Sequence, residues 1–244
     1  MGDGVFETIR VRQGRPVRLE RHLARLQAGA AVLGIPARFG EAEIEAGCTS
    51  AIAGNAVLDG SLRISLSRGP AARGLASPVA PNPTLLIAAH KANATSEPVI
   101  LLTARTTRRN EHSPLSRIKS LNYLDGILAR REAEAGGADD ALMLNTAGLV
   151  AESTAATLIA FAEDRLWTPR IEDGALPGIA RQVLMDTALV AERVITPDWL
   201  ARVPVMFLCN SLGVRSVSAL DGRSLKERPE LLDGLRKALE PDRF

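Results

Sequence analysis

The sequence contains little of what stabilises small secreted proteins or holds a chain in a membrane. Its 244 residues include only two cysteines, Cys48 and Cys209, with no Cys-x-x-Cys or Cys/His pairing. Their separation argues against a disulfide framework or a zinc site and fits a reducing compartment. No apolar run approaches the length of a membrane span, and residues 1–15 lack the apolar core of a signal peptide. We therefore expect a cytoplasmic protein with no membrane partner.

The sequence also lacks a strong excess of charge of either sign. The 30 lysines and arginines only slightly outnumber the 28 acidic residues, and they are scattered along the chain. Nucleic-acid-binding surfaces concentrate basic residues, so we expect no nucleic-acid partner. Hydrophobic residues make up 46% of the chain, which is ordinary for a globular protein and sufficient for one large domain or two modest ones.

The order of the periodic segments predicts two α+β domains, covering residues 1–95 and 96–244 and joined near residues 92–98. In the first domain we expect strands over residues 5–11, 61–69 and 83–91, a short strand after residue 13, and helices over 20–33 and 39–55. In the second we expect a strand over residues 99–105, helices over 121–135, 179–189 and 228–239, hairpins centred on residues 145–148 and 163–164, and further strands within 204–222.

One lysine stands in unusual surroundings. Lys119 lies in "HSPLSRIKSLNYLDG", among small, apolar and hydroxylated residues just before an expected helix. A lysine before a helix is ordinarily a solvated surface residue. The alternative is a nucleophilic amine, because an apolar pocket lowers the pKa of a lysine and frees the amine to attack a carbonyl carbon. Schiff-base chemistry uses such an amine, and pyridoxal phosphate is its commonest aldehyde.

A bound pyridoxal phosphate also needs partners for its phosphate. Arg25, on the first expected helix, offers a bidentate guanidinium, although arginines on helices often lie at the surface. The segment "LPGIARQ" places a helix start after a glycine, so the N–H groups of Ile179 and Ala180 are candidate anion donors. Many helix starts of this kind bind nothing.

The pyridine ring of the cofactor makes two further demands, for a carboxylate and a hydrogen-bond donor. Glu152 stands in the strand-like run "GLVAESTAATL", where a glutamate must find a partner or remain exposed. Tyr123, the only tyrosine, lies four positions after Lys119 and points to the same pocket if the helix begins that early. An ordinary core tyrosine is the alternative.

Taken together, these segments resemble the class IV aminotransferase family, the fold-type IV pyridoxal phosphate enzymes. The family includes branched-chain aminotransferases, D-amino acid aminotransferases and 4-amino-4-deoxychorismate lyases. The resemblance covers nearly the whole chain and implies a two-domain α+β fold of this type. Its markers are "GDGVFETIRV", "RHLARL", "SLSRGPAARG", "RIKSLNYL", "GLVAESTAATL", "LPGIARQVL" and "LCNSLGVRSV".

The resemblance also implies roles for individual residues. Lys119 forms the Schiff base and moves the proton, and Glu152 keeps the pyridine nitrogen protonated. The residues assigned to the cofactor are Arg25, Lys119, Tyr123, Glu152, Ile179, Ala180 and Ser211. The spacing from Lys119 to Tyr123 is one residue shorter than in branched-chain enzymes. A homodimer is implied as well, with an active site near the interface that the second subunit completes.

Two departures from the family pattern stand out. The family carries a further strand before "GDGVFET", whereas this chain starts at Met1, so either the start codon was assigned late or a sheet edge is exposed. Thr157 stands where the family often has asparagine, and we expect this to change a structural hydrogen bond rather than the chemistry.

Two arginines are candidates for binding the carboxylate of a small amino substrate. D-amino acid enzymes carry an Arg-x-His pair where this chain reads Arg73-Gly74-Leu75, so the arginine is kept and the histidine is lost. A surface position in a loop is the alternative for Arg73. Arg63 aligns with a substrate-site arginine of branched-chain enzymes, but it is equally compatible with an exposed strand residue.

The reaction that we favour is the elimination of pyruvate from 4-amino-4-deoxychorismate, which yields 4-aminobenzoate, a folate precursor. The segment "CNSLGVRSV" resembles the Asn-Ser/Ala-Leu segment of the aminodeoxychorismate lyases. The alternative is a class IV transaminase acting on branched-chain or D-amino acids with a 2-oxo acid acceptor. A non-catalytic binding protein is a third possibility, against which the retention of Lys119, Glu152 and Arg25 argues.

Overall fold

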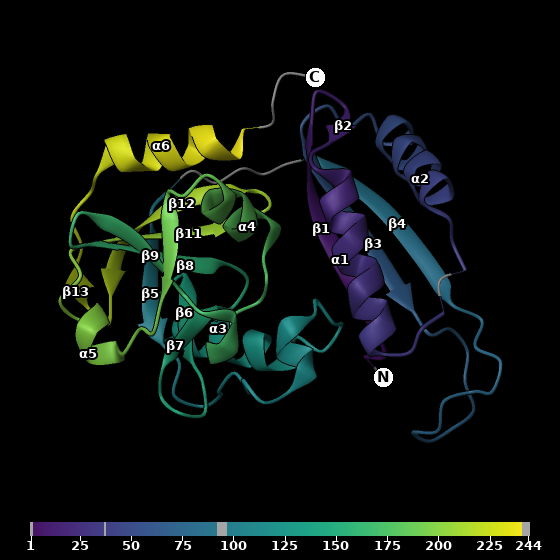
Figure 1. Ribbon diagram of the computed structural model, residues 1–244, viewed down its shortest axis with the longest axis horizontal. Helices are drawn as coiled ribbons and strands as arrows, with labels where there is room; N and C mark the ends of the chain where they lie inside the picture. Colours follow the sequence, from purple (N-terminus) through teal and green to yellow (C-terminus); the bar gives the residue numbers. More distant parts are fainter. Residues whose placement is uncertain (1, 37, 92–96, 241–244) are drawn as a thin grey trace. The chain divides into compact units, whose positions relative to one another are not determined.

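The computed structural model describes residues 2–36, 38–91 and 97–240, which form two compact units (Figure 1). The first unit contains the described residues up to 91 together with residues 118–122, and the second contains residues 97–117 and 123–240. Both units combine helices with a β-sheet, so the predicted α+β class is confirmed. The expected junction near residues 92–98 lies mostly outside the described residues.

The first unit is a four-stranded antiparallel sheet with two helices. The strand order is β2-β1-β3-β4. The elements are β1 (Gly4–Arg12), β2 (Arg15–Pro16), α1 (Leu19–Val32), α2 (Glu41–Gly54), β3 (Gly60–Ser67) and β4 (Thr84–Lys91). All the strands and helices expected here from the sequence are present, with ends shifted by a few residues.

Alternation along β1 places one apolar row against α1. Val5, Ile9 and Val11 point to this face and are at most 1% exposed, in a core shared with Leu23 and Leu26 of α1. Glu7 belongs to the same row by its position, which puts a carboxylate into an otherwise apolar face. The sequence pattern therefore dictates that this glutamate must be compensated by buried partners.

The lysine-bearing segment joins the first unit as an additional strand-like edge. Phe6 donates its N–H to the carbonyl oxygen of Lys119 at 2.8 Å, and Leu121 donates to Gly4 at 2.8 Å. Ile118 packs in the same core as β1 and α1. Gly29 of α1 permits this packing, since a Cβ there would lie 3.1 Å from the Val5 side chain and 3.6 Å from Ile118.

The second unit is built on a nine-stranded mixed sheet. Its strand order is β10-β9-β8-β11-β12-β5-β6-β7, with β13 paired to β12. The strands are β5 (Val99–Thr103), β6 (Asp140–Leu144), β7 (Val150–Ser153), β8 (Thr157–Ala162), β9 (Arg165–Pro169), β10 (Val190–Arg193), β11 (Val205–Asn210), β12 (Gly213–Leu220) and β13 (Arg223–Ser224). The helices are η1 (Pro114–Arg117), α3 (Leu124–Ala135), η2 (Ile171–Asp173), α4 (Ile179–Asp186), α5 (Pro197–Leu200) and α6 (Pro229–Leu239).

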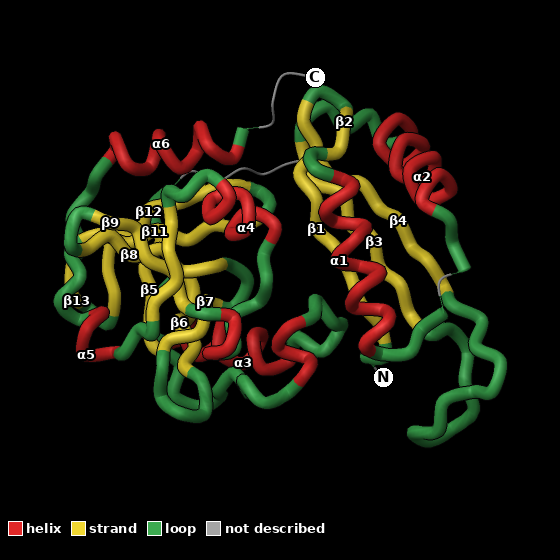
Figure 2. The backbone as a smooth tube through the Cα atoms, viewed as in Figure 1, coloured by secondary structure: helices red, strands yellow, loops and turns green. Residues whose placement is uncertain are grey.

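Helices lie against this sheet (Figure 2). Separate apolar clusters pack them onto it. Side chains of α4 and α6, such as Leu184 and Leu235, pack with Phe207 of β11. Ala129 and Ala133 of α3 pack in a second, alanine-rich cluster. Among the described residues, no helix is long and apolar enough to cross a membrane.

The structure departs from the sequence prediction at the start of α3. The helix begins at Leu124, three residues later than expected, and Tyr123 occupies its N-cap position. Lys119 and Tyr123 therefore do not share a helical face, because Lys119 is paired with β1 instead. Several short elements were not expected, namely η1, η2, β10, α5 and β13.

Candidate active site

Glu7 is the centre of a buried polar cluster in the first unit. Its side chain is 0% exposed, and Arg25 of α1 binds it through two hydrogen bonds, from Nε at 2.8 Å and from Nη2 at 2.6 Å. His22, one helical turn before Arg25, places its Nδ1 atom 2.6 Å from Glu7 Oε2. The two helical residues thus compensate the carboxylate that the strand pattern buries.

The protonation states in this cluster follow from burial and contact. Burial raises the pKa of Glu7, but the hydrogen bonds from His22 and Arg25 outweigh it and bring the pKa below its ordinary value. Burial lowers the pKa of His22, and the nearby positive charges of Arg25 and Lys119 act in the same direction. An ionised carboxylate only accepts hydrogen bonds, so the Nδ1 atom of His22 carries a proton and donates it to Glu7.

The side chains of Lys119 and Arg63 both contact the ring of Phe6. The Lys119 Nζ atom lies 4.4 Å from the ring centroid, and the Arg63 guanidinium carbon lies 3.9 Å from it. Phe6 is 6% exposed and Lys119 is half-buried, whereas Arg63 is exposed. A cation over an aromatic face is stabilised by the ring quadrupole. The first unit therefore presents an amine and an exposed guanidinium around one aromatic side chain.

The second unit also contains a buried carboxylate, that of Glu152. It lies on β7 and is 9% exposed. Its Oε2 atom accepts a hydrogen bond from the backbone N–H of Leu176 at 3.0 Å, and its Oε1 atom lies 3.0 Å from Nε of Arg109. The charge of this buried glutamate is thus compensated, and both oxygens are fixed in position.

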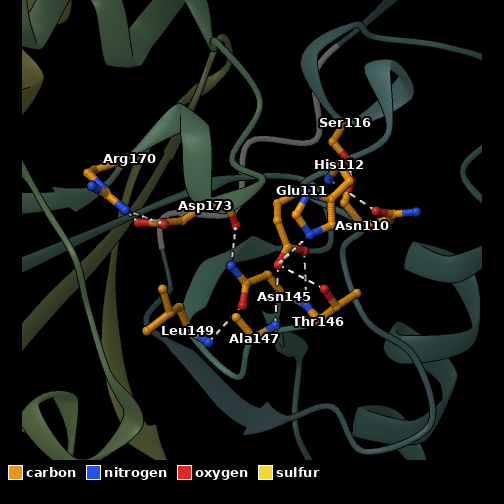
Figure 3. A network of polar contacts seen from close by, with 10 residues as sticks. All are labelled: Asn110, Glu111, His112, Ser116, Asn145, Thr146, Ala147, Leu149, Arg170 and Asp173. Carbon is orange, nitrogen blue, oxygen red and sulfur yellow. Dashed lines mark hydrogen bonds and ion pairs between the residues drawn. The ribbon is translucent and has the colours of Figure 1, made fainter.

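Polar contacts connect the loop before η1, the turn between β6 and β7, and η2 (Figure 3). Glu111 accepts hydrogen bonds from the N–H and hydroxyl of Thr146, at 3.0 and 2.8 Å, in the turn between β6 and β7. Asn145 donates from Nδ2 to the carbonyl oxygen of Asp173 at 3.1 Å, and Arg170 binds the Asp173 carboxylate at 2.7 Å. Burial raises the pKa of Glu111, but hydrogen bonds from backbone N–H groups and from the Thr146 hydroxyl hold it below its usual value.

A candidate anion site lies where α4 begins. Ile179 and Ala180 occupy the first turn, whose N–H groups have no acceptor within the helix, and no side chain caps Gly178. A Cβ on Gly178 would lie 3.4 Å from the Thr157 hydroxyl oxygen, which shows how closely β8 approaches this turn. The helix start, small residues and a hydroxyl group form a surrounding suited to a phosphate.

Ser211 lies in the turn between β11 and β12. The preceding Asn210 accepts a hydrogen bond from the N–H of Leu212 at 2.9 Å and donates to the carbonyl oxygen of Ala155 at 3.3 Å. This side chain ties the turn to the segment that follows Glu152. Ser211 itself is half-buried.

The predicted residues divide between the two units. Lys119, Arg25 and Arg63 lie in the first, together with Arg73, which is exposed in the loop between β3 and β4. The second unit contains the remaining predicted residues, Tyr123, Glu152, Ile179, Ala180 and Ser211. Each unit thus groups part of the predicted set, and their roles in binding a cofactor or substrate stay predictions.

Sequence reasoning missed three residues of these clusters. Glu7 was detectable, because strand alternation places it in the apolar row of β1. His22 was detectable as well, because it lies three residues before the predicted Arg25 on the same helix, and residues at this spacing share a helical face. Arg109 gave no signal, because it lies in a polar loop and the carboxylate that it pairs with, Glu152, lies 43 positions later.

Comparison with known proteins points to one family. The model of the family "Amino-transferase class IV" matches residues 4–220. Branched-chain-amino-acid aminotransferase-like protein 2 of Arabidopsis thaliana is 32% identical over 93% of this chain and 42% of its own length. The chain therefore spans less than half of that plant protein.

Two solved structures are similar over nearly their full length. The 4-amino-4-deoxychorismate lyase of Pseudomonas aeruginosa is 32% identical with a TM-score of 0.82, and the match covers 97% of this chain and 91% of that one. A hypothetical aminotransferase of Mycobacterium tuberculosis in its PLP-bound form is 26% identical with a TM-score of 0.82, covering 98% and 89%. The fold type predicted from the sequence is confirmed.

Proposed function

Because the chain belongs to the class IV amino-transferase family, we propose that it is a pyridoxal phosphate-dependent 4-amino-4-deoxychorismate lyase. The reaction releases pyruvate and 4-aminobenzoate, a precursor of folate. The observation that carries the cofactor assignment is the placement of Lys119, a half-buried amine on the ring of Phe6 in the same unit as the Glu7–His22–Arg25 cluster.

The residues present fit pyridoxal phosphate. Glu7 occupies two of the five N–H donors of the Arg25 guanidinium and fixes its plane, as a phosphate-binding arginine requires. The first turn of α4 supplies backbone N–H donors at Ile179 and Ala180. Glu152 is a buried carboxylate with both oxygens held, suited to a protonated ring nitrogen. We assign Ser211 to the phosphate as well and Tyr123 to the phenolic oxygen.

Bound pyridoxal phosphate supplies an electron sink for carbanion chemistry. The chain supplies the proton transfer: Lys119 Nζ takes the proton from the amine-bearing carbon of the substrate. The C–O bond to the enolpyruvyl group then breaks, and its electron pair leaves with the oxygen as the enolate of pyruvate. The ring becomes aromatic, and the enolate takes up a proton on carbon to give pyruvate. Arg63 and Arg73 are our candidates for the substrate carboxylates, and the contact of Arg63 with the Phe6 ring supports the first.

The turn that contains Asn210 favours the lyase over a transaminase. Asn210 bridges Ala155 and Leu212, so the Asn-Ser-Leu sequence that resembles the lyases builds this turn through its asparagine side chain. Similarity to the lyase of Pseudomonas aeruginosa supports the same assignment. The second candidate function is that of a transaminase, which the similarity to the plant protein named after branched-chain aminotransferases supports.

Paired assays of the purified protein with added pyridoxal phosphate distinguish the two reactions. We expect 4-amino-4-deoxychorismate to yield equimolar pyruvate and 4-aminobenzoate, detected by chromatography. In the second arm, L-leucine or D-alanine is supplied with 2-oxoglutarate, and glutamate formation is measured. Glutamate without any 4-aminobenzoate in the first arm would overturn the lyase in favour of the transaminase.

We also propose that the protein acts as a homodimer. Three apolar side chains on one face of α3, Leu124, Ile127 and Leu128, are between 50% and 72% exposed. Neighbouring exposed apolar residues of this kind favour association. Light scattering after size-exclusion chromatography is expected to give twice the mass of one chain, and Ile127→Asp to reduce the dimer fraction. A monomer at micromolar concentration would contradict the proposal.

A further inference from the structure

We propose that Arg109 is a positioning residue that holds Glu152 and the segment leading to α4 in the geometry required for pyridoxal phosphate. The inference rests on the proposed cofactor, because Glu152 and α4 are its expected binding groups. Arg109 itself is not a candidate to touch the cofactor. Its effect is exerted through the carboxylate of Glu152 and the backbone of residues 174–176.

The side chain of Arg109 contacts three parts of the chain at once. Its Nε atom lies 3.0 Å from Glu152 Oε1 and donates to the carbonyl oxygen of Gly174 at 3.1 Å. Its Nη2 atom donates to the carbonyl oxygen of Ser116 at 3.0 Å. With 21% of the side chain exposed, the guanidinium is largely removed from water, which strengthens its pairing with the carboxylate.

The second carboxylate oxygen of Glu152 is also held by a hydrogen bond. Leu176 donates its N–H to Glu152 Oε2, so Arg109 and Leu176 hold the two oxygens from two sides. Residue 176 stands three positions before Ile179, where α4 begins. One arginine therefore links the carboxylate assigned to the ring nitrogen with the segment that leads to the helix assigned to the phosphate.

Gly174 is adapted to this contact. Its φ of +98° lies in the left-handed region, and a Cβ there would be 3.3 Å from the Cβ of Arg109 and 3.6 Å from the backbone of Glu111. A side chain at this position would be strained and would push against the loop that contains Arg109. The backbone of residue 174 is thus shaped to bring its carbonyl oxygen to the guanidinium.

The loop that contains Arg109 is itself anchored. Arg109 donates its backbone N–H to Leu144 at 2.9 Å, and Glu111 receives hydrogen bonds from Thr146 and Ala147 in the turn after β6 (Figure 3). Asn145 in the same turn holds the carbonyl oxygen of Asp173. Arg109 therefore reaches Glu152 from a fixed backbone, which is what an orienting residue requires.

A double-mutant cycle on the affinity for pyridoxal phosphate tests the inference. The apoproteins of the wild type, Arg109→Gln, Glu152→Gln and the double variant are titrated with pyridoxal phosphate, and binding is followed by visible absorbance. We expect Arg109→Gln to weaken binding about tenfold, the loss that corresponds to one charge-assisted hydrogen bond. In the Glu152→Gln background the same change is expected to cost less than about twofold, because Arg109 acts through Glu152.

Two further variants separate positioning from general structural damage. Arg170→Gln removes the partner of Asp173 on the same segment without touching Glu152, and we expect near-wild-type binding. Arg109→Lys keeps the charge but loses the planar fork, and an intermediate affinity is expected. Equal losses from Arg109→Gln in both backgrounds would overturn the inference while leaving the cofactor assignment intact. A wild-type protein that binds no pyridoxal phosphate would overturn both.

Discussion

Replacing Lys119 by alanine is expected to lower kcat by about 10⁴-fold or more, with the fold unchanged. The change removes both the nucleophilic amine and the base that takes the substrate proton, and a positioned general base alone contributes about 10² to 10⁴-fold. Binding through Arg25, Glu152 and the first turn of α4 remains, so the variant is expected to retain non-covalent affinity for pyridoxal phosphate. Steady-state kinetics of 4-aminobenzoate release measure the effect.

The control for this experiment is Lys91→Ala. Lys91 is an exposed residue at the end of β4 in the same unit, and its loss is expected to leave kcat unchanged. A Lys119→Ala variant that keeps more than about a tenth of the wild-type kcat would be incompatible with its role as nucleophile and base.

Replacing Glu7 by glutamine is expected to destabilise the protein by about 3 kcal/mol, the cost of breaking a buried ion pair by removing its carboxylate. The Arg25 side chain is only 10% exposed and donates hydrogen bonds to both carboxylate oxygens, so a neutral amide removes the negative charge that faces the guanidinium. Because the same contacts fix the plane of the guanidinium, weaker binding of pyridoxal phosphate is expected as well. Urea unfolding of the apoprotein at pH 7 measures the stability change.

The pH dependence of stability provides a second test of this cluster. The folded-state pKa values of Glu7 and His22 both lie below their ordinary values. The unfolded state therefore binds protons before the folded state does, and stability falls as the pH falls. The loss begins below about pH 6.5 through His22 and continues below about pH 4.3 through Glu7, with reference values for the unfolded chain. Glu7→Gln is expected to abolish the second part.

The matched control for Glu7→Gln is Glu43→Gln. Glu43 is exposed in the first turn of α2 in the same unit, so its substitution is expected to change stability by no more than about 0.5 kcal/mol. Equal stability changes in the two variants would show that the buried carboxylate does not hold Arg25 in place.

Local sequence patterns sufficed for most of the fold, since the main strands and helices are periodic. The alternation in β1 and the helical spacing in α1 predicted both elements. The start of α3 was mispredicted because residues 118–122 have helical neighbours in sequence but pair with β1 in the structure. Tertiary pairing outweighed local propensity there.

Local sequence patterns predicted only part of the candidate site. Motif residues such as Lys119, Glu152 and Ile179 were recognisable because they lie in short, distinctive segments. Their supporting contacts depend on long-range register: Arg109 meets Glu152 only because β5, β6 and β7 align their loops at one edge. Glu7 was readable as a buried carboxylate, but its pairing with two α1 residues required the packing of the helix on the strand.

The central claim is that Lys119 is the amine that bonds to the aldehyde of pyridoxal phosphate. The chain has only four lysines, at positions 91, 119, 226 and 237, so borohydride reduction of the protein incubated with pyridoxal phosphate, followed by peptide mass spectrometry, gives an unambiguous assignment. We predict one phosphopyridoxyl group per chain, carried by the peptide that contains Lys119. Modification spread over the other three lysines, or none at all, would contradict the account.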